Sequence, residues 1–403
     1  MRELDFSSQS KETVLALGNL LDLYGDEMYR WLARLYDPKI GGFYYSNSAR
    51  DYEGFLPDVE STAQALYAMG NNGLFERFGG SLRDALPSGM RDEITDFTRS
   101  LQDEDGYFYH PQWGKDIPVM RRGRDLSWGI GLLKNLGSET KYPSAAEQIS
   151  SGKAKVPENL QSKEAFVEYL YTCPNYVKGY MNHLIHTMNA QQEEIRGAGL
   201  LPTLFEFLEK EQSAETGLWG KGICYNGATA LMKATLIYKF DGKMMKYADT
   251  ALDSCIKVVL SDEVATRLVD ITNPWVAMIN LVDMIRSAGK VALADEFIEK
   301  IKANAPSLIN ATADKLKIYA HPDKTFSFLP EFTNPVSQNV PVALKNEREG
   351  DVNATVIAYN SAKRILTLIG VERSEFFSGD DYDEFLSIVD AWQPVAKKKN
   401  PQI

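Results

Sequence analysis

"STAQALYAMG" (residues 61–70) is small or apolar almost all the way round a helix and carries no charged residue. A helix of that kind has no polar face to turn toward water, so we expect it to be buried on every side. "ATALMKATLI" (228–237) has nearly the same character. By contrast, "MRDEITDFTRSL" (90–101) is amphipathic, with charged residues between its apolar positions. The sequence therefore predicts both buried helices and helices that are exposed along one side.

The two kinds of helix alternate along the whole chain. Apolar spacing of three and four residues predicts pairs in which an amphipathic helix precedes a buried one. One pair recurs roughly every 45 to 80 residues, which indicates an internal repeat of helical hairpins. The amphipathic helices are predicted over 8–36, 88–102, 162–172, 201–212, 243–260 and 292–309. The buried helices are predicted to begin near residues 58, 125, 175, 225, 270 and 351.

Six buried helices, each with an outer partner, can close into a barrel inside a ring. The predicted fold class is therefore all-α, an (α/α)6 toroid formed by one domain over residues 1–403. Residues 138–160 are polar and are predicted to be a loop excursion, and residues 375–403 a C-terminal helix and tail.

Composition excludes several classes of protein. The chain has 403 residues and a net charge of −11, which argues against nonspecific binding to nucleic acid. Three cysteines without paired spacing predict neither a disulfide framework nor a zinc-finger site. The N-terminus lacks the pattern of a signal peptide, and no uncharged apolar stretch approaches the length of a membrane span. We therefore expect a soluble cytoplasmic protein that does not bind membranes.

Glycine and aromatic residues recur in the loops that precede buried helices. Examples are "GGFYYS" (41–46), "DGYFYHPQWG" (105–114) and "TGLWGKG" (216–222). The longer stretch "SLQDEDGYFYHPQWG" is similar to the glycine-aromatic and Gln-Trp elements of terpenoid cyclases and protein prenyltransferases. "DEDGYFYHPQWGKD" followed by "RGRDLSWGIGLL" resembles the loop and helix start of unsaturated glucuronyl hydrolases, which belong with the six-hairpin glycosidases and toroidal polysaccharide lyases. Both resemblances imply a toroid whose cavity holds the active site.

Polar residues gather where the buried helices are predicted to begin. In a toroid these starts share one rim, so their side chains would point into one cavity. Aspartate is a preferred N-cap, and a structural role explains any one of these positions. A cluster of carboxylates in a concave site can also supply general acid and base. The candidate catalytic residues are Asp58, Glu60, Asp125, Asp270 and Asp351, with Tyr225 and His110 as the alternative for an elimination reaction.

Aromatic and basic residues beside these starts are candidates for substrate binding. Aromatic rings either pack the loops onto the helices or form a wall for a sugar or an isoprenoid. "GKDIPVMRRGRD" (114–125) is a basic approach to a buried helix, and arginine matches carboxylates and phosphates. The substrate-binding candidates are Tyr44, Tyr45, Tyr109, Trp113, Arg121, Arg124, Trp128, Trp219 and Asn226.

Neither a metal nor another cofactor is predicted. His183 and His186 have a spacing that can bind a metal, but no third ligand is visible nearby. "DDYDE" (380–384) resembles diphosphate-binding motifs but lies beyond the sixth hairpin, and Asp253 with Cys255 falls in the middle of an outer helix. No phosphate-binding loop, dinucleotide fingerprint or nucleophile elbow appears in its expected context.

Together these features favour a carbohydrate-active enzyme. The expected reaction is cleavage of a glycosidic bond in an anionic glycan that contains uronic acid, by a carboxylate acid and base or, as a second route, by elimination. Two alternatives stay open. One is a terpenoid cyclase or prenyltransferase relative that acts on an isoprenoid, and the other is a non-catalytic toroid that binds a glycan or a protein.

Overall fold

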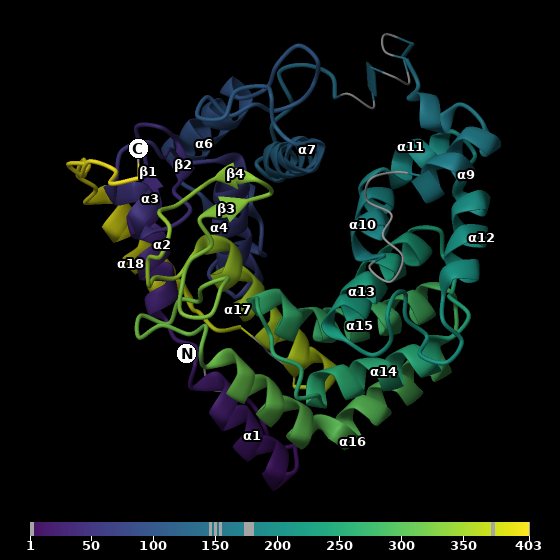
Figure 1. Cartoon of the computed structure of the whole chain (residues 1–403). Helices are drawn as coiled ribbons and strands as arrows, with labels where there is room; N and C mark the ends of the chain where they lie inside the picture. Colours follow the sequence, from purple (N-terminus) through teal and green to yellow (C-terminus); the bar gives the residue numbers. More distant parts are fainter. Residues whose placement is uncertain are drawn as a thin grey trace.

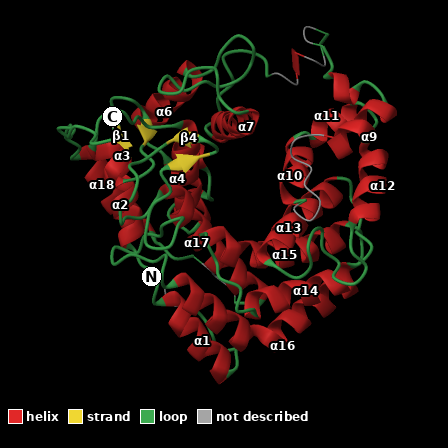
Figure 2. Cartoon of the chain, in the orientation of Figure 1, coloured by secondary structure: helices red, strands yellow, loops and turns green. Residues whose placement is uncertain are grey.

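The computed structural model describes residues 4–144, 147–148, 151–152, 155–172, 181–371 and 375–402. Helices make up most of this part of the chain, and the strands form two short antiparallel pairs (Figure 2). In the first pair Tyr36 of β1 (Tyr36–Asp37) lies opposite Phe43 of β2 (Gly42–Phe43), and the second joins β3 (Val336–Ser337) to β4 (Val340–Pro341). The predicted all-α class is confirmed.

A curved row of helices forms the inner layer of the structure (Figure 1). Neighbours in this row pack against each other in the order α10, α13, α15, α17, α4 and α7. Alanine, glycine and threonine are frequent on these helices and let their backbones approach closely. The row consists of α4 (Val59–Asn71), α7 (Val119–Asn135), α10 (Asn182–Ala190), α13 (Tyr225–Phe240), α15 (Leu268–Ser287) and α17 (Val352–Leu368).

A second layer covers the outer side of this row. Helix α14 packs against α15 and α16, α1 packs against α16, and α18 packs against α2. The longer outer helices are α1 (Lys11–Leu21), α2 (Glu27–Leu35), α6 (Ser88–Ser100), α9 (Lys163–Thr172), α12 (Leu201–Glu211), α14 (Ala248–Leu260), α16 (Val291–Leu316) and α18 (Gly379–Asp390). Shorter helical segments are α3 (Asn47–Asp51), η1 (Glu76–Phe78), α5 (Leu82–Ala85), η2 (Glu158–Leu160) and α11 (Gln192–Gly197).

The inner helices begin close to most of the predicted positions. Asp58 and Asp351 are the N-caps of α4 and α17, and α13 begins at Tyr225. Helix α15 begins at Leu268, two residues before the predicted start. The predicted start near residue 175 lies outside the described residues.

Three predicted boundaries are wrong. The predicted helix over 8–36 is two helices, α1 and α2. Gly25 lies in the connection between them, where its amide donates to the Tyr359 hydroxyl and its carbonyl accepts from that hydroxyl. Helix α7 begins at Val119 instead of near residue 125. Pro118 precedes its first residue, where the missing amide of proline does no harm. Helix α16 also runs past its predicted end, to Leu316.

The glycine-aromatic loop over 41–46 is held by its own packing. Gly41 has a φ of +82°, and a Cβ atom there would lie 2.2 Å from the carbonyl oxygen of Glu93. The Phe43 amide donates to the hydroxyl of Thr62 on α4, at 2.9 Å. Tyr44 and Tyr45 are buried. Of the two roles weighed for these aromatics, packing the loop onto the helices is the one that the structure shows.

Segments from the two halves of the sequence meet beside this loop. The Val352 amide donates to the Tyr45 carbonyl at 2.9 Å, and Ser46 forms a bridge with Asp351. Farther along, the amide of Lys398 in the C-terminal tail donates to the backbone carbonyl of Asp51. The start of α17 is thereby fixed next to the start of α4.

Helix α15 is long and apolar enough to cross a membrane by length and composition alone. It is mostly buried between α13, α14, α16 and α17, as the core helix of a water-soluble fold would be.

Candidate functional site

One buried arginine lies among three carboxylates at the start of α4 and on α7. Arg121 is fully buried, and its Nη2 lies 2.8 Å from Oδ1 of Asp125 and 3.2 Å from Oδ1 of Asp58. Its Nη1 lies 3.3 Å from Oε2 of Glu60. The guanidinium carbon also lies 4.3 Å from the ring centre of Trp113. We call Arg121, Asp58, Glu60 and Asp125 the Arg121 cluster.

Helix geometry places each member of the cluster. Asp58 caps α4, because its Oδ1 accepts the Ser61 amide at 3.0 Å while its Oδ2 accepts the Ser61 hydroxyl at 2.6 Å. Glu60 follows in the first turn of the same helix. Arg121 and Asp125 lie four residues apart on α7, a spacing that brings two helical side chains together. Two neighbouring helices thus bring all three carboxylates to one guanidinium.

The earlier start of α7 changes the expected role of its basic residues. Arg121 and Arg124 lie on the helix and not on a loop before it, and Asp125 lies inside the helix instead of capping it. Arg124 Nε donates to Oε1 of Glu60 at 2.6 Å, and its side chain is 26% exposed. Arg124 is therefore the part of the site that solvent reaches, since the carboxylates beneath it are buried.

Further polar groups complete the hydrogen bonding of Glu60. Gln64 donates its Nε2 to Oε1 of Glu60 at 3.0 Å and to Oδ1 of Asn353 on α17 at 2.9 Å. The Ser337 hydroxyl lies 3.4 Å from Oε2 of Glu60. Sequence reasoning missed these three residues. The signal for Gln64 was present, because it is a polar residue in the middle of the apolar stretch 61–70.

Burial gives Asp125 an unusual proton affinity. Removal from water raises the pKa of Asp125 to about 7, although Arg121 opposes the shift. Its Oδ2 accepts from Arg121 Nε at 2.9 Å, whereas Oδ1 has no partner in hydrogen-bond geometry. Asp125 therefore exchanges its proton near neutral pH.

Replacement of Asp125 by asparagine is expected to affect stability in a pH-dependent way. Because the pKa is raised on folding, the ionised Asp125 is destabilising, and that cost grows as pH rises from about 4 to about 7. Asp125→Asn should therefore raise the melting temperature at pH 8 and leave it nearly unchanged at pH 4. Calorimetry of both proteins at the two pH values measures the difference. A variant that is less stable at pH 8 would contradict the assigned proton affinity.

Tyr45, Asp351 and His110 lie beside the Arg121 cluster in structural roles. Asp351 caps α17, with its Oδ1 2.8 Å from the Ala354 amide, and burial raises its pKa to about 6. The pKa of the Tyr45 hydroxyl is raised by burial and then by Asp351. His110 places its Nε2 2.8 Å from the Pro57 carbonyl, and its Nδ1 accepts the Gln112 amide. Burial lowers the pKa of His110, which favours the neutral ring.

Other predicted residues lie apart from this cluster, near the start of α13 and α15. Asp270 accepts from the Arg267 guanidinium at 2.8 Å and from the Arg267 amide, so it stabilises the first turn of α15. Tyr225 begins α13, and burial raises its pKa to about 12. Oδ1 of the neighbouring Asn226 has no hydrogen-bond partner among the described residues.

The predicted aromatic residues divide into two groups. Trp219 is fully buried and donates its Nε1 to the Leu208 carbonyl at 2.9 Å, so like Tyr44 and Tyr45 it packs inside the protein. Tyr109, Trp113 and Trp128 are only partly buried. The side chains of this second group are therefore partly accessible to solvent.

The acidic motif 380–384, which resembles a diphosphate-binding motif, has a structural role. Asp381 caps α18 through Ser378, Asp383 pairs with Arg77, and Glu384 pairs with Arg30. Among the described residues, no group of three or more His, Cys, Asp or Glu side chains could hold a metal ion.

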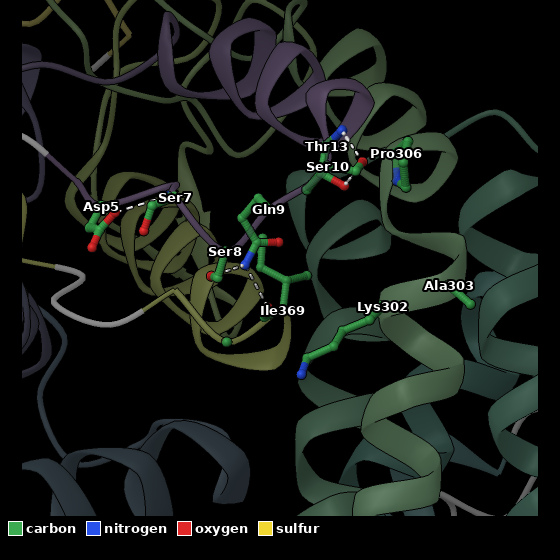
Figure 3. A pocket seen from close by; sticks show the side chains of 11 residues that line it. Asp5, Ser7, Ser8, Gln9, Ser10, Thr13, Lys302, Ala303, Pro306 and Ile369 are labelled. Carbon is green, nitrogen blue, oxygen red and sulfur yellow. Dashed lines mark hydrogen bonds between the residues drawn. The ribbon is translucent and has the colours of Figure 1, made fainter.

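Two cavities lie away from the Arg121 cluster. One, of about 590 Å³, is lined by residues of the N-terminal segment and α16, including Gln9, Ser10 and Lys302 (Figure 3). The other, of about 370 Å³, lies beside α2 and α3 and is lined by Trp31 and Arg34 among others. Neither is lined by a predicted catalytic residue, so the candidate site rests on the Arg121 cluster itself.

The fold and the site together define an all-helical protein with a buried arginine–carboxylate cluster. No family model matches the chain, and no curated protein matches it. A solved structure described as a protein from Actinoplanes is similar over 89% of this chain and 100% of its own, with 13% identity and a TM-score of 0.43.

Proposed function

We propose that the protein is an (α/α)6 toroid that cleaves a glycosidic bond in an anionic glycan. Support for the toroid comes from the curved row of inner helices and the outer layer that covers it. The cytoplasm is the proposed location, with an oligosaccharide or a smaller sugar derivative as the substrate.

The observation that carries the proposed chemistry is the unequal environment of the carboxylates around Arg121. Glycosidases use one carboxyl group that is protonated and a second that is ionised. The raised pKa of Asp125 suits it to donate a proton near pH 7. Glu60 accepts hydrogen bonds from Arg124 and Gln64, which fix the position of its carboxyl group. We assign Asp125 as the acid and Glu60 as the base or nucleophile.

Substrate access to these carboxylates requires Arg124 to move. Arg124 covers Glu60 and is the partly exposed member of the site. A uronic carboxylate offers Arg124 the same kind of charged acceptor that Oε1 of Glu60 offers now. In the proposed function, the substrate carboxylate draws Arg124 away and exposes Glu60, while Trp113 and Trp128 contact the sugar rings.

Hydrolysis is favoured over elimination by the state of the predicted elimination residues. Tyr225 would have to lose its proton to act as a base, and its raised pKa opposes that loss. His110 has both ring nitrogens engaged by backbone groups and cannot neutralise a substrate carboxylate.

A non-catalytic binding protein is the second candidate. The observation that favours it is the burial of Asp58, Glu60 and Asp125, each less than 5% exposed in its side chain. Carboxylates with this degree of burial and hydrogen bonding can serve the fold alone. The isoprenoid alternative has less support, because the acidic residues of 380–384 cap and brace α18.

The test is an assay of the purified protein on a panel of oligosaccharides that contain uronic acids, together with neutral oligosaccharides of matched length. We expect new reducing ends from at least one anionic member, without the ultraviolet absorbance of an unsaturated uronide. The unsaturated product would instead indicate elimination. Absence of product from every member, under conditions in which the same sugars bind, would support the binding protein and contradict the enzyme.

A further inference from the structure

Lys233 occupies an unusual position on the inner row of helices. It is the one charged residue in the apolar stretch 228–238 of α13. Its side chain is partly buried, and its Nζ donates to the Asn182 carbonyl at the start of α10, at 3.4 Å. A lysine in an apolar helix could have been noticed in the sequence, but sequence reasoning treated this stretch only as core.

The charged neighbours of Lys233 come from three other elements. Arg124 on α7 and Arg267, which precedes α15, are near enough for their charges to act on Lys233. His183 follows Asn182 directly and His186 lies one turn of α10 after it, so the hydrogen bond from Lys233 to Asn182 brings Lys233 to the part of α10 that carries both histidines. The charges of Lys233, Arg124 and His183 act on His186. His183 in turn interacts with Lys233 and Arg267. We call these five basic residues the basic cluster.

Burial and the repulsion between like charges both oppose protonation of Lys233 and His186. Burial, followed by the two arginines, lowers the pKa of Lys233 to about 8. Burial, followed by Lys233, lowers the pKa of His186 to about 4. Since like charges repel, gathering these groups costs free energy in the absence of a counter-ion.

The acidic residues of the protein neutralise only part of the positive charge of the basic cluster. Arg124 pairs with Glu60, and Arg267 pairs with Asp270. Lys233, His183 and His186 form no ion pair with any residue in the described part of the chain. Solvent can reach the cluster, because His183 and Arg267 are exposed. A protein with a net charge of −11 thus presents a local surplus of positive charge on its inner side.

We infer that the basic cluster binds a ligand with two or more negative charges, carried by neighbouring carboxylates or by a diphosphate. A single carboxylate would be matched by Lys233 alone, whereas further negative charge is matched when His183 and His186 take up protons. The carboxylate form rests on the proposed function, since an oligouronide would place successive carboxylates along the inner row. Binding is coupled to proton uptake, so affinity increases as pH falls.

Calorimetric titration at pH 6 and pH 8 tests this site with three probes: trigalacturonate, inorganic pyrophosphate and the neutral maltotriose. We expect an anion to bind more tightly than maltotriose, with an affinity that is about tenfold higher or more at pH 6 for each proton taken up. The anion that binds more tightly shows whether the ligand carries its negative charge on carboxylates or on a diphosphate. Equal binding of anions and maltotriose, or anion binding that does not change with pH, would overturn the inference.

Lys233→Gln is the diagnostic variant, and Lys239→Gln is its matched control. Lys239 lies on the same helix but is exposed and pairs with Asp283 at 2.8 Å. Lys233→Gln should weaken anion binding about tenfold or more while raising the melting temperature of the free protein, because it removes a repelled charge. Lys239→Gln should change neither property. If Lys233→Gln does not fold, His186→Gln tests the same coupling and should reduce proton uptake.

These measurements are independent of turnover. Anion binding without any cleaved product would support this site and contradict the proposed enzyme. Cleavage of neutral and anionic sugars at equal rates, with no anion preference in binding, would contradict this site and leave the enzyme standing.

Discussion

Replacing Arg121 with methionine should lower the free energy of unfolding by about 3–5 kcal/mol at pH 7, the range found when one partner of a buried ion pair is removed. Asp58, Glu60 and Asp125 all contact this guanidinium and are buried with it. Methionine fills much of the volume but leaves these carboxylates without their shared counter-charge. Chemical denaturation at pH 7 measures the loss.

The pH dependence of this variant separates lost charge from lost packing. Protonation of the carboxylates removes their repulsion, so the deficit of Arg121→Met should shrink when denaturation is repeated at pH 5. Arg286→Met is the control, since Arg286 pairs with Asp295 at the surface and should cost less than about 1 kcal/mol. A deficit for Arg121→Met no larger than that of the control would show that the cluster does not hold α4 and α7 together.

Replacing Asp125 with asparagine should lower the turnover of the best substrate by about 10²–10⁴-fold, the range attributed to a positioned acid or base. Asparagine keeps the shape of the side chain and can accept from Arg121 Nε, but it has no proton to donate to a leaving group. Because the same variant is expected to be as stable as the parent or more so, the lost activity could not be attributed to unfolding. Steady-state kinetics at pH 6 gives kcat and KM separately.

Controls for this experiment come from the site and from the surface. Glu60→Gln should also lower kcat, whereas Asp295→Asn, at an exposed carboxylate, should leave both constants unchanged. Full activity of Asp125→Asn on every substrate would remove Asp125 from the mechanism and leave its raised pKa as a property of the fold.

Much of the fold could be predicted from helix periodicity and composition. The stretch 61–70 is apolar all round because α4 packs between α17 and α7 in the inner row, and that pattern needs no knowledge of distant contacts. The start of α7 was missed because Gly123 and the arginines of 119–124 look like a loop. Arg121 is satisfied inside the protein only through carboxylates on a second helix, so its burial depends on tertiary contacts.

The candidate site was predicted only in part for the same reason. Asp58 and Glu60 were placed correctly at the start of α4, but their pairing with Arg121 required the packing of α4 against α7. The basic cluster draws one or two residues from each of four elements, and its members are far apart in the sequence. The hydrophobic pattern of α13 shows Lys233 as an exception in an apolar stretch, but it does not indicate which cations on other elements lie near it.

The bridge between the first loop and the start of α17 has a consequence for how the chain folds. The Ser48 amide donates to the carboxylate of Glu349, which lies 301 residues later in the chain. The Tyr45 carbonyl accepts from the amide of Val352, which is also made late. Contacts between residues so far apart in the sequence form slowly. During synthesis they cannot form until the later segment has left the ribosome. Asn353, which binds Gln64 beside Glu60, arrives with the same segment. The nascent chain therefore stays without a finished site until its last inner helix is made.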